Sequence, residues 1–197
     1  TVIGNTTPKF QGGFGLSGQW KNFDFTANFN YMVDFDVYNA TNYMLSSSIS
    51  NTNNFYNVLA DFTQKNRWTY VRADGECLYK NTNIDGSVNE YITMNAGKSL
   101  WNPADVEDKV THSYFVEDGS FLRLQDVTIG YTLPSNLTKK WGMSKVRFYA
   151  SASNLFILTG YSGYDPEVDV QSGLTPSMDY NRYPRSRSFV FGTNITF

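Results

Sequence analysis

The sequence contains one cysteine and one histidine among its 197 residues. A lone Cys77 cannot form a disulfide within the chain, and a lone His112 excludes a metal site built from several histidines. Any Ser–His dyad would depend on His112, which lies in a polar segment without a nucleophile elbow. Phosphate-binding loops and dinucleotide fingerprints are also missing. These absences argue against an enzyme, and no cofactor is expected.

Long apolar runs and an excess of positive charge are missing too. The net charge is −2 and the pI is about 5.3, so the basic footprint of a nucleic-acid-binding protein is absent. Hydrophobic residues make up 41% of the chain, yet no stretch approaches the roughly 20 apolar residues of a membrane helix. Aromatic residues reach 17%, and interfacial girdles of Trp and Tyr would account for this excess.

What the sequence does contain is a long alternation of apolar and polar residues. Every odd position from Phe23 to Val37 is apolar or aromatic, and every even position except Met32 is polar. A strand sends successive side chains to opposite faces, and a strand that crosses a bilayer needs about 9–11 residues. The alternation therefore predicts a membrane barrel wall. Its polar parity includes four residues expected to face the lumen: Asp24, Asn28, Asn30 and Asp34.

Similar patterns recur along the chain and predict an all-β fold of antiparallel up-and-down strands. The strands are expected at about 10–20, 23–37, 118–133, 145–159 and 186–197. Short turns follow the first and third strands, whereas long loops at 39–113 and 161–185 follow the second and fourth. Outer-membrane barrels place short turns in the periplasm and long loops outside the cell. A change of parity within the third strand predicts a β-bulge near Arg123–Asp126.

Five strands cannot close a lumen, because the smallest barrels use about eight. A barrel protein must also be exported, yet the chain begins at Thr1 without an initiator Met or a signal peptide. We therefore expect residues 1–197 to be a C-terminal fragment of a longer protein.

Three long motifs in the second half of the chain are specific. They are residues 113–134 (SYFVEDGSFLRLQDVTIGYTLP), residues 154–168 (NLFILTGYSGYDPEV) and residues 179–187 (DYNRYPRSR), the last followed by a strand that ends at Phe197. In this order they resemble the late barrel segment of SusC/RagA-type TonB-dependent outer-membrane transporters. The opening residues Ile3–Pro8 with Gly12 and Gly13 are similar to the same family.

This resemblance implies a plugged barrel of about 22 strands, in the outer membrane of a Gram-negative bacterium and in contact with its lipid. It implies import of oligosaccharides or peptides, a SusD-like lipoprotein that caps the barrel, and energy from TonB through an N-terminal part that this chain lacks. It also implies that Phe197 is the recognition signal for the barrel-assembly machinery.

Several side chains are candidates for binding. Asp165, Glu167 and Asp169 alternate in the last long loop and are weak candidates for a Ca²⁺ site, although such a loop is more often simply solvated. Arg147 is expected to face the lumen, where it or Arg123 would pair with an aspartate; ordinary lumen polarity is the alternative. Six loop aromatics are predicted to form a partner or substrate surface, or else a packed loop core: Trp68, Trp101, Tyr161, Tyr164, Tyr180 and Tyr183.

Two other functions compete with transport. A secreted carbohydrate-binding β-sandwich would be a soluble monomer in which Phe25, Phe29 and Val33 pack against a second sheet. An outer-membrane hydrolase would need a nucleophile–base pair, which the sequence does not supply.

Overall fold

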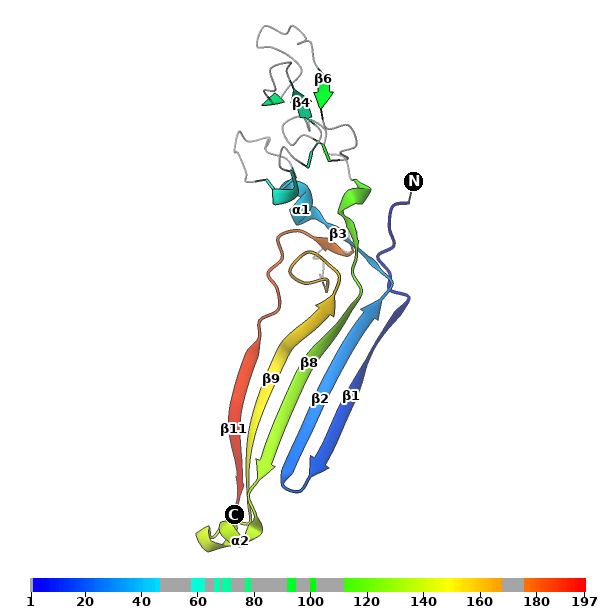
Figure 1. Ribbon diagram of the computed structural model, residues 1–197. Helices are drawn as coiled ribbons and strands as arrows, with labels where there is room; N and C mark the ends of the chain where they lie inside the picture. Colours follow the sequence, from blue (N-terminus) through cyan, green and yellow to red (C-terminus); the bar gives the residue numbers. More distant parts are fainter. Residues whose placement is uncertain are drawn as a thin grey trace. The chain divides into compact units, whose positions relative to one another are not determined.

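Alternating side chains give this chain long antiparallel strands, as the computed structural model in Figure 1 shows. The structure describes residues 2–46, 58–62, 66–67, 69–71, 77–78, 92–94, 100–101, 112–167 and 176–197. The chain divides into two units, one formed by residues 1–38 and 116–197 and the other by residues 39–115.

Strands dominate the first unit, and the described helices of the chain are short. In chain order the elements are β1 (Phe10–Trp20), β2 (Phe23–Val33), β3 (Asp36–Asn39), α1 (Ala40–Met44), η1 (Ala60–Phe62), β4 (Thr69–Val71), β5 (Cys77–Leu78), β6 (Ile92–Met94), η2 (Ser113–Phe115), β7 (Val116–Asp118), β8 (Phe121–Thr132), α2 (Ser135–Thr138), η3 (Lys139–Trp141), β9 (Lys145–Thr159), β10 (Met178–Asp179) and β11 (Ser188–Thr196).

The first unit is built on a five-stranded antiparallel sheet in the order β1-β2-β8-β9-β11 (Figure 1). Strands β1 and β9 have the bounds expected from the alternation, and β11 lies within the expected 186–197. Lys21 and Asn22 form the two-residue turn of the β1–β2 hairpin, and Lys21 adopts a positive φ of 53°. The five strands therefore follow the predicted up-and-down order, with the long insertions between β2 and β8 and between β9 and β11.

A bulge interrupts the sheet where the parity of β8 changes. Gln125 has no partner in either neighbouring strand, because the register shifts between Leu124 and Asp126. On β9 the irregularity falls at Asn154, whose φ is 53°. The extra residue keeps Leu122 and Leu124 on the same face as the apolar residues of the lower half of β8.

The second expected strand is too long. β2 ends at Val33, and Asp34 adopts a positive φ of 62°, a conformation that Asp tolerates better than most residues. The chain then enters β3, which belongs to a separate three-stranded sheet in the order β10-β3-β7. Phe35 and Val37 continue the alternation in sequence, but they point into a different packing layer.

That layer is the small hydrophobic core of the first unit. Phe35, Val37, Phe121 and Tyr161 are at most 6% exposed and pack together, with Met32 and Ile157 beside them. The expected strand at 118–133 is likewise divided, into β7 and β8, with Gly119 donating its N–H to the carbonyl of Phe35 over 2.8 Å. This core lies where the strands meet the long loops.

The short connection between β8 and β9 contains α2 and η3. Pro134 precedes α2, and Gly142 ends η3 with a φ of 70°. Val146 is only 4% exposed, whereas Phe148, two residues further on the same parity, is 49% exposed. α2 contacts β9 at this end of the sheet, where Val146 is buried.

The second unit contains an aromatic cluster. The ring of Trp101 lies 5.0 Å from that of Phe62 and 5.6 Å from that of Phe115, and Tyr43 meets Phe115 edge-on. The N–H of Leu59 donates to the carbonyl of Leu45 over 3.0 Å, which joins η1 to the end of α1. Among the described residues, no helix is long and apolar enough to cross a membrane.

Candidate functional site

The five-stranded sheet has one apolar face. On this face Phe14 stacks on Phe29 at 4.9 Å, and Phe23 packs against Tyr131 at 4.6 Å. Many of its side chains remain exposed in the described structure, among them Phe10, Phe14, Leu16, Trp20, Phe23, Phe25, Val33, Ile129, Phe148, Phe156, Leu158, Phe189, Phe191 and Ile195. Monomeric soluble proteins rarely expose an apolar surface of this extent.

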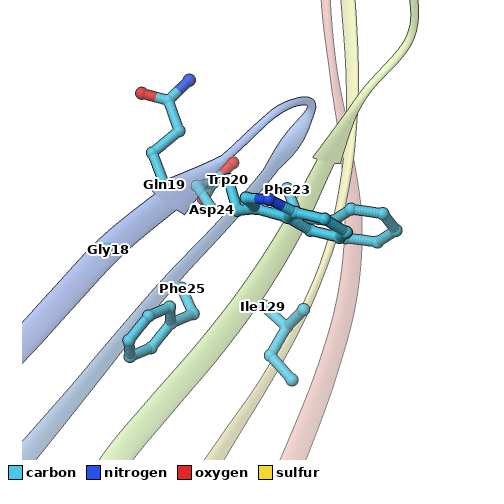
Figure 2. Close-up of a pocket in the computed structure, with 7 residues that line it drawn as sticks. All are labelled: Gly18, Gln19, Trp20, Phe23, Asp24, Phe25 and Ile129. Atoms are coloured by element: carbon cyan, nitrogen blue, oxygen red, sulfur yellow. The ribbon is translucent and has the colours of Figure 1, made fainter.

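A groove of about 240 Å³ opens on the apolar face near the β1–β2 turn. Figure 2 shows Phe25 on one side of it and Ile129 on the other, with Trp20 and Phe23 close together at one end. A Cβ atom on Gly18 would lie 2.5 Å from the ring of Phe25, so the glycine allows this ring to lean toward β1. The groove is the space left between the tilted ring and β8.

The opposite face is polar, and its charges are paired within the sheet. Arg147 on β9 donates from Nε to Oδ1 of Asp24 over 3.0 Å and from Nη2 to Oδ2 over 2.5 Å. Asp24 lies on β2, so the pair bridges two strands across β8. A Cβ on Gly130 would lie 2.4 Å from Nη2 of Arg147 and 2.6 Å from Oδ1 of Asp24, which means that the pair occupies the space above this glycine.

Further contacts extend this arrangement along the polar face. Thr128 and Ser151 share a 2.7 Å hydrogen bond between their hydroxyls, and Ser153 donates to Asp126 over 2.7 Å. The guanidinium of Arg147 also lies 5.3 Å from the ring centre of Tyr149. Most of these polar groups therefore satisfy one another across neighbouring strands.

The structure places most of the predicted lumen residues on this polar face. Asn28 and Asn30 share the face of Asp24, and Arg147 joins them from β9. The Oδ1 atom of Asn30 is buried without a hydrogen-bond partner in the described structure. The prediction that Asp34 faces the lumen with them is wrong, because Asp34 lies in the turn after β2. There its carboxylate pairs with Lys9, and its own N–H donates to the hydroxyl of Ser120.

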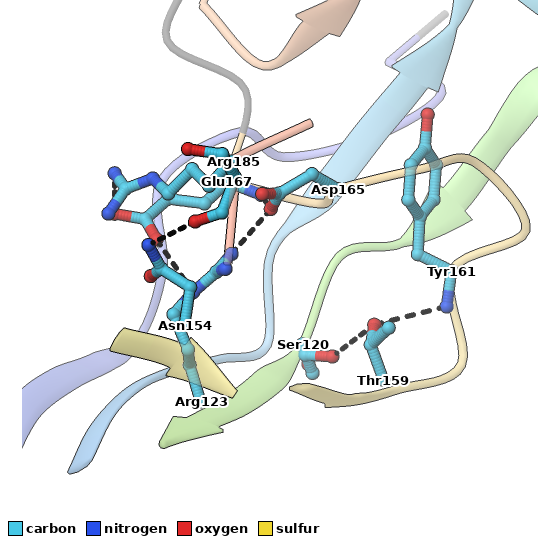
Figure 3. A network of polar contacts seen from close by, with 9 residues as sticks. Ser120, Arg123, Asn154, Thr159, Tyr161, Asp165, Glu167 and Arg185 are labelled. Carbon is cyan, nitrogen blue, oxygen red and sulfur yellow. Dashed lines mark hydrogen bonds and ion pairs between the residues drawn. The ribbon is translucent and has the colours of Figure 1, made fainter. Parts of the chain in front are cut away.

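At the long-loop end, a charge network fixes the loop after β9 to the sheet (Figure 3). Arg123, only 4% exposed, donates from Nη2 to Oδ1 of Asp165 over 2.6 Å, and its Nε lies 3.3 Å from Oε2 of Glu167. Arg185 donates to Oε1 of Glu167 over 2.7 Å. Asn154 of the bulge donates to the carbonyl of Ser186 over 3.1 Å. The network joins β8, the 161–167 segment and the segment before β11.

This network gives the candidate calcium ligands another role. Asp165 and Glu167 neutralise two arginines, and Asp169 lies outside the described residues. Across the part of the chain that the structure describes, no group of three or more His, Cys, Asp or Glu side chains is placed to hold a metal ion. Sequence reasoning paired Arg123 with an aspartate of the strands and missed its loop partners. The spacing of Asp165 and Glu167 around Pro166 was the only sequence feature that pointed to these partners.

The loop aromatics separate into buried and exposed groups. Tyr161 is 6% exposed and donates its hydroxyl to Asp179 over 2.7 Å, so it belongs to the core and not to a partner surface. Burial and the neighbouring carboxylate raise the pKa of the Tyr161 phenol. In contrast, Tyr164, Tyr180 and Tyr183 are 77%, 60% and 87% exposed. Trp101 packs in the aromatic cluster of the second unit, and Trp68 lies outside the described residues.

Comparison with known proteins finds similar sequences among TonB-dependent receptors. The chain is 32% identical over 202 aligned residues to TonB-dependent receptor P3 of Formosa agariphila, and the match covers all of the chain and 17% of the relative. It is also 41% identical over 86 residues to TonB-dependent receptor SusC of Bacteroides thetaiotaomicron, which is 43% of the chain and 8% of that protein. Over its whole length the chain is similar to a TonB-dependent receptor, and over part of it to SusC. No protein-family model matches it.

Solved structures of the SusC/RagA type share the fold. A structure of the RagAB peptide transporter superposes with a TM-score of 0.70 at 24% identity, covering 100% of this chain and 18% of that one. The open-open state of the RagAB peptide importer gives a TM-score of 0.69. The resemblance inferred from the three motifs is thus confirmed, and the chain spans less than a fifth of the length of these relatives. The curated relatives are named as receptors and not as enzymes.

Proposed function

We propose that the chain forms part of the wall of an outer-membrane transporter that imports oligosaccharides or peptides in a TonB-dependent manner. In this proposal the chain is the C-terminal portion of a barrel of about 22 strands. The apolar face of the sheet contacts lipid, and the polar face with Asp24, Asn28, Asn30 and Arg147 borders the lumen. A SusD-like lipoprotein caps the barrel, and TonB supplies energy through the N-terminal part of the receptor.

The main observation behind this proposal is the contrast between the two faces of one sheet. Membrane barrels alternate apolar residues toward lipid with polar residues toward the interior, and every backbone group in the span must be paired within the sheet. Phe25 and Val33 are 46% and 42% exposed on the apolar face. A β-sandwich would instead bury them against a second sheet, so this observation weighs against the alternative of a secreted carbohydrate-binding module.

The relatives support the class of cargo. The RagAB structures are named for a peptide importer, and SusC is named a TonB-dependent receptor. On this chain, the exposed rings of Tyr164, Tyr180 and Tyr183 are the proposed surface for the lipoprotein or for substrate, because aromatic faces suit both sugar stacking and protein contacts. Phe197, 88% exposed, remains the proposed barrel-assembly signal.

The wall assignment is tested by moving one charge between the two faces. Phe29→Arg places a cation on the apolar face near the middle of β2, which should cost about 2–4 kcal/mol of folding free energy in a bilayer. Asn28→Arg, one residue away on the polar face, is the matched control and should change stability by less than about 1 kcal/mol. The measurement is equilibrium unfolding of the receptor from phospholipid vesicles. Equal effects of the two substitutions would contradict the wall assignment.

The transport assignment is tested separately in cells. Cells that carry the receptor should take up labelled oligosaccharides or peptides, and uptake should stop when TonB is depleted. Co-purification of the SusD-like lipoprotein tests the lid. Uptake that is identical with and without the receptor would refute the transport function while leaving the wall assignment intact.

A further inference from the structure

We propose that the short-turn end of the sheet binds an anionic phospholipid, with its headgroup at Lys21, Lys139 and Lys140 and one acyl chain in the groove between Phe25 and Ile129. The inference rests on the proposed function, because it requires the apolar face to meet a bilayer. It goes further by assigning a ligand of defined charge to one place on that face.

The groove near the β1–β2 turn is largely apolar. It lies on the apolar face within the first unit and is lined by Trp20, Phe23, Phe25 and Ile129, together with Gly18, Gln19 and Asp24. The carboxylate of Asp24 is paired with Arg147. Figure 2 shows the gap between the Phe25 ring and the Ile129 side chain. A narrow apolar groove of about 240 Å³ has the chemistry of a hydrocarbon chain and lacks the convergent polar groups of a sugar site.

Lysines lie near the groove at the short-turn end of the sheet. Lys21 follows Trp20 in the turn, and its ammonium lies 4.8 Å from the Trp20 ring centre. The segment from Leu133 to Lys145 contains three lysines and no acidic residue. The nearby acid Asp24 is already held by Arg147, so no carboxylate of this hairpin neutralises Lys21.

The β8–β9 connection lies at the same end of the sheet as the β1–β2 turn. The N–H of Thr132 donates to the carbonyl of Asn22 over 2.8 Å, so the β1–β2 turn and the end of β8 lie side by side. Figure 1 shows α2 at this same end of the sheet. Lys139 and Lys140 are exposed in this connection, which contacts β9 through α2. Trp141, 61% exposed, is a typical interfacial anchor.

The opposite end of the sheet has the opposite balance. Among its described residues, the acidic side chains Asp34, Asp36, Glu117, Asp118, Asp165, Glu167 and Asp179 outnumber the basic side chains Lys9, Arg123, Arg182, Arg185 and Arg187. Charge complementarity therefore favours an anionic headgroup at the short-turn end only. A lysine near an anionic surface favours binding by roughly fivefold, and the long apolar stems of lysines let their ammonium groups reach the headgroup level.

The test uses the whole receptor in cell membranes, with the photoreactive amino acid benzoylphenylalanine in place of Phe25. After irradiation, mass spectrometry identifies the lipid attached at this position. We expect phosphatidylglycerol or another anionic phospholipid to be enriched over its share of the membrane. The triple variant Lys21→Gln, Lys139→Gln, Lys140→Gln should remove most of the enrichment, and Lys140→Gln alone should reduce it by up to about fivefold.

Two controls separate the possible failures. The photoreactive residue in place of Phe10, on the same face at the long-loop end, should capture lipid without this enrichment, and Arg187→Gln should leave the Phe25 result unchanged. Capture of lipid in bulk proportions at Phe25, with no effect of the lysines, would overturn the lipid site alone. Capture of protein in place of lipid at both positions would overturn the membrane wall, and with it the proposed function.

Discussion

The ion pair above Gly130 gives a prediction that depends on the geometry of three strands. A Cβ at position 130 would lie 2.4 Å from Nη2 and 2.5 Å from Nε of Arg147. These atoms end a flexible side chain, so Gly130→Ala should displace the guanidinium without shifting the backbone. The cost is then the lost ion pair with Asp24, and the substitution also removes the entropic disadvantage of glycine in a strand.

The two contributions have opposite signs and can be separated. The side chains of Arg147 and Asp24 are 22% and 35% exposed, which places the pair between surface pairs of about 0.2–1 kcal/mol and buried pairs whose breaking costs about 3–5 kcal/mol. We take about 1–2 kcal/mol for its loss, against about 0.5–1 kcal/mol gained by replacing glycine in a strand. Gly130→Ala should therefore destabilise the native protein by up to about 1.5 kcal/mol. In an Asp24→Ala, Arg147→Ala background it should stabilise by about 0.5–1 kcal/mol.

The assay is equilibrium unfolding of the receptor from vesicles, repeated in both backgrounds as a double-mutant cycle. Gly15→Ala is the matched control, because its Cβ would meet only the side-chain oxygen of Asn28 and a backbone oxygen, and no ion pair. Its effect should be the same in both backgrounds. A Gly130→Ala effect that does not depend on the ion pair would refute the account of why glycine occupies this position.

The remaining predictions concern the loop end. Arg123→Met removes a buried cation from Asp165 and Glu167, which should cost about 3–5 kcal/mol and make the 161–167 segment more sensitive to limited proteolysis. Unchanged cleavage would show that the network does not hold the loop. Because burial and Asp179 raise the pKa of Tyr161, its hydrogen bond is fully present below about pH 10, the ordinary tyrosine value, and weakens only as pH rises through the higher folded value. Tyr161→Phe should therefore lower the free energy of unfolding at neutral pH. Above about pH 10 the free energy of unfolding of this variant should fall less than that of the native protein. Denaturant unfolding across that pH range measures both effects.

The alternation predicted much of the sheet because one physical rule, the opposite direction of successive side chains, holds along the whole of β1, β2 and β9. The same rule gave the bulge at Gln125, since a change of parity without an extra residue would turn Leu122 and Leu124 to the polar face. It failed at Asp34, because Phe35 and Val37 keep the alternation in sequence while the backbone changes direction. Parity reports a face and does not report which sheet the face belongs to.

The polar contacts were harder to predict. The sequence offered Arg123 and Arg147 as equivalent partners for strand aspartates, and only Arg147 pairs in that way. Arg123 differs because it lies above the bulge, where the loop after β9 returns over the sheet and brings Asp165 within reach. Such a contact joins residues 42 positions apart, and it depends on how a loop folds, which local patterns do not specify. The burial of Tyr161 likewise depends on how this loop folds, so local sequence patterns do not specify it.

The bulge at Gln125 also divides β8 into two zones with different tolerance to substitution. Below it, charged replacements should be selected against at the odd positions Val127, Ile129 and Tyr131; above it, the sensitive positions become the even ones, Leu122 and Leu124. A one-residue deletion at Gln125 would therefore exchange the two faces of β8 on one side of the deletion and turn Arg123 toward the apolar face of the sheet.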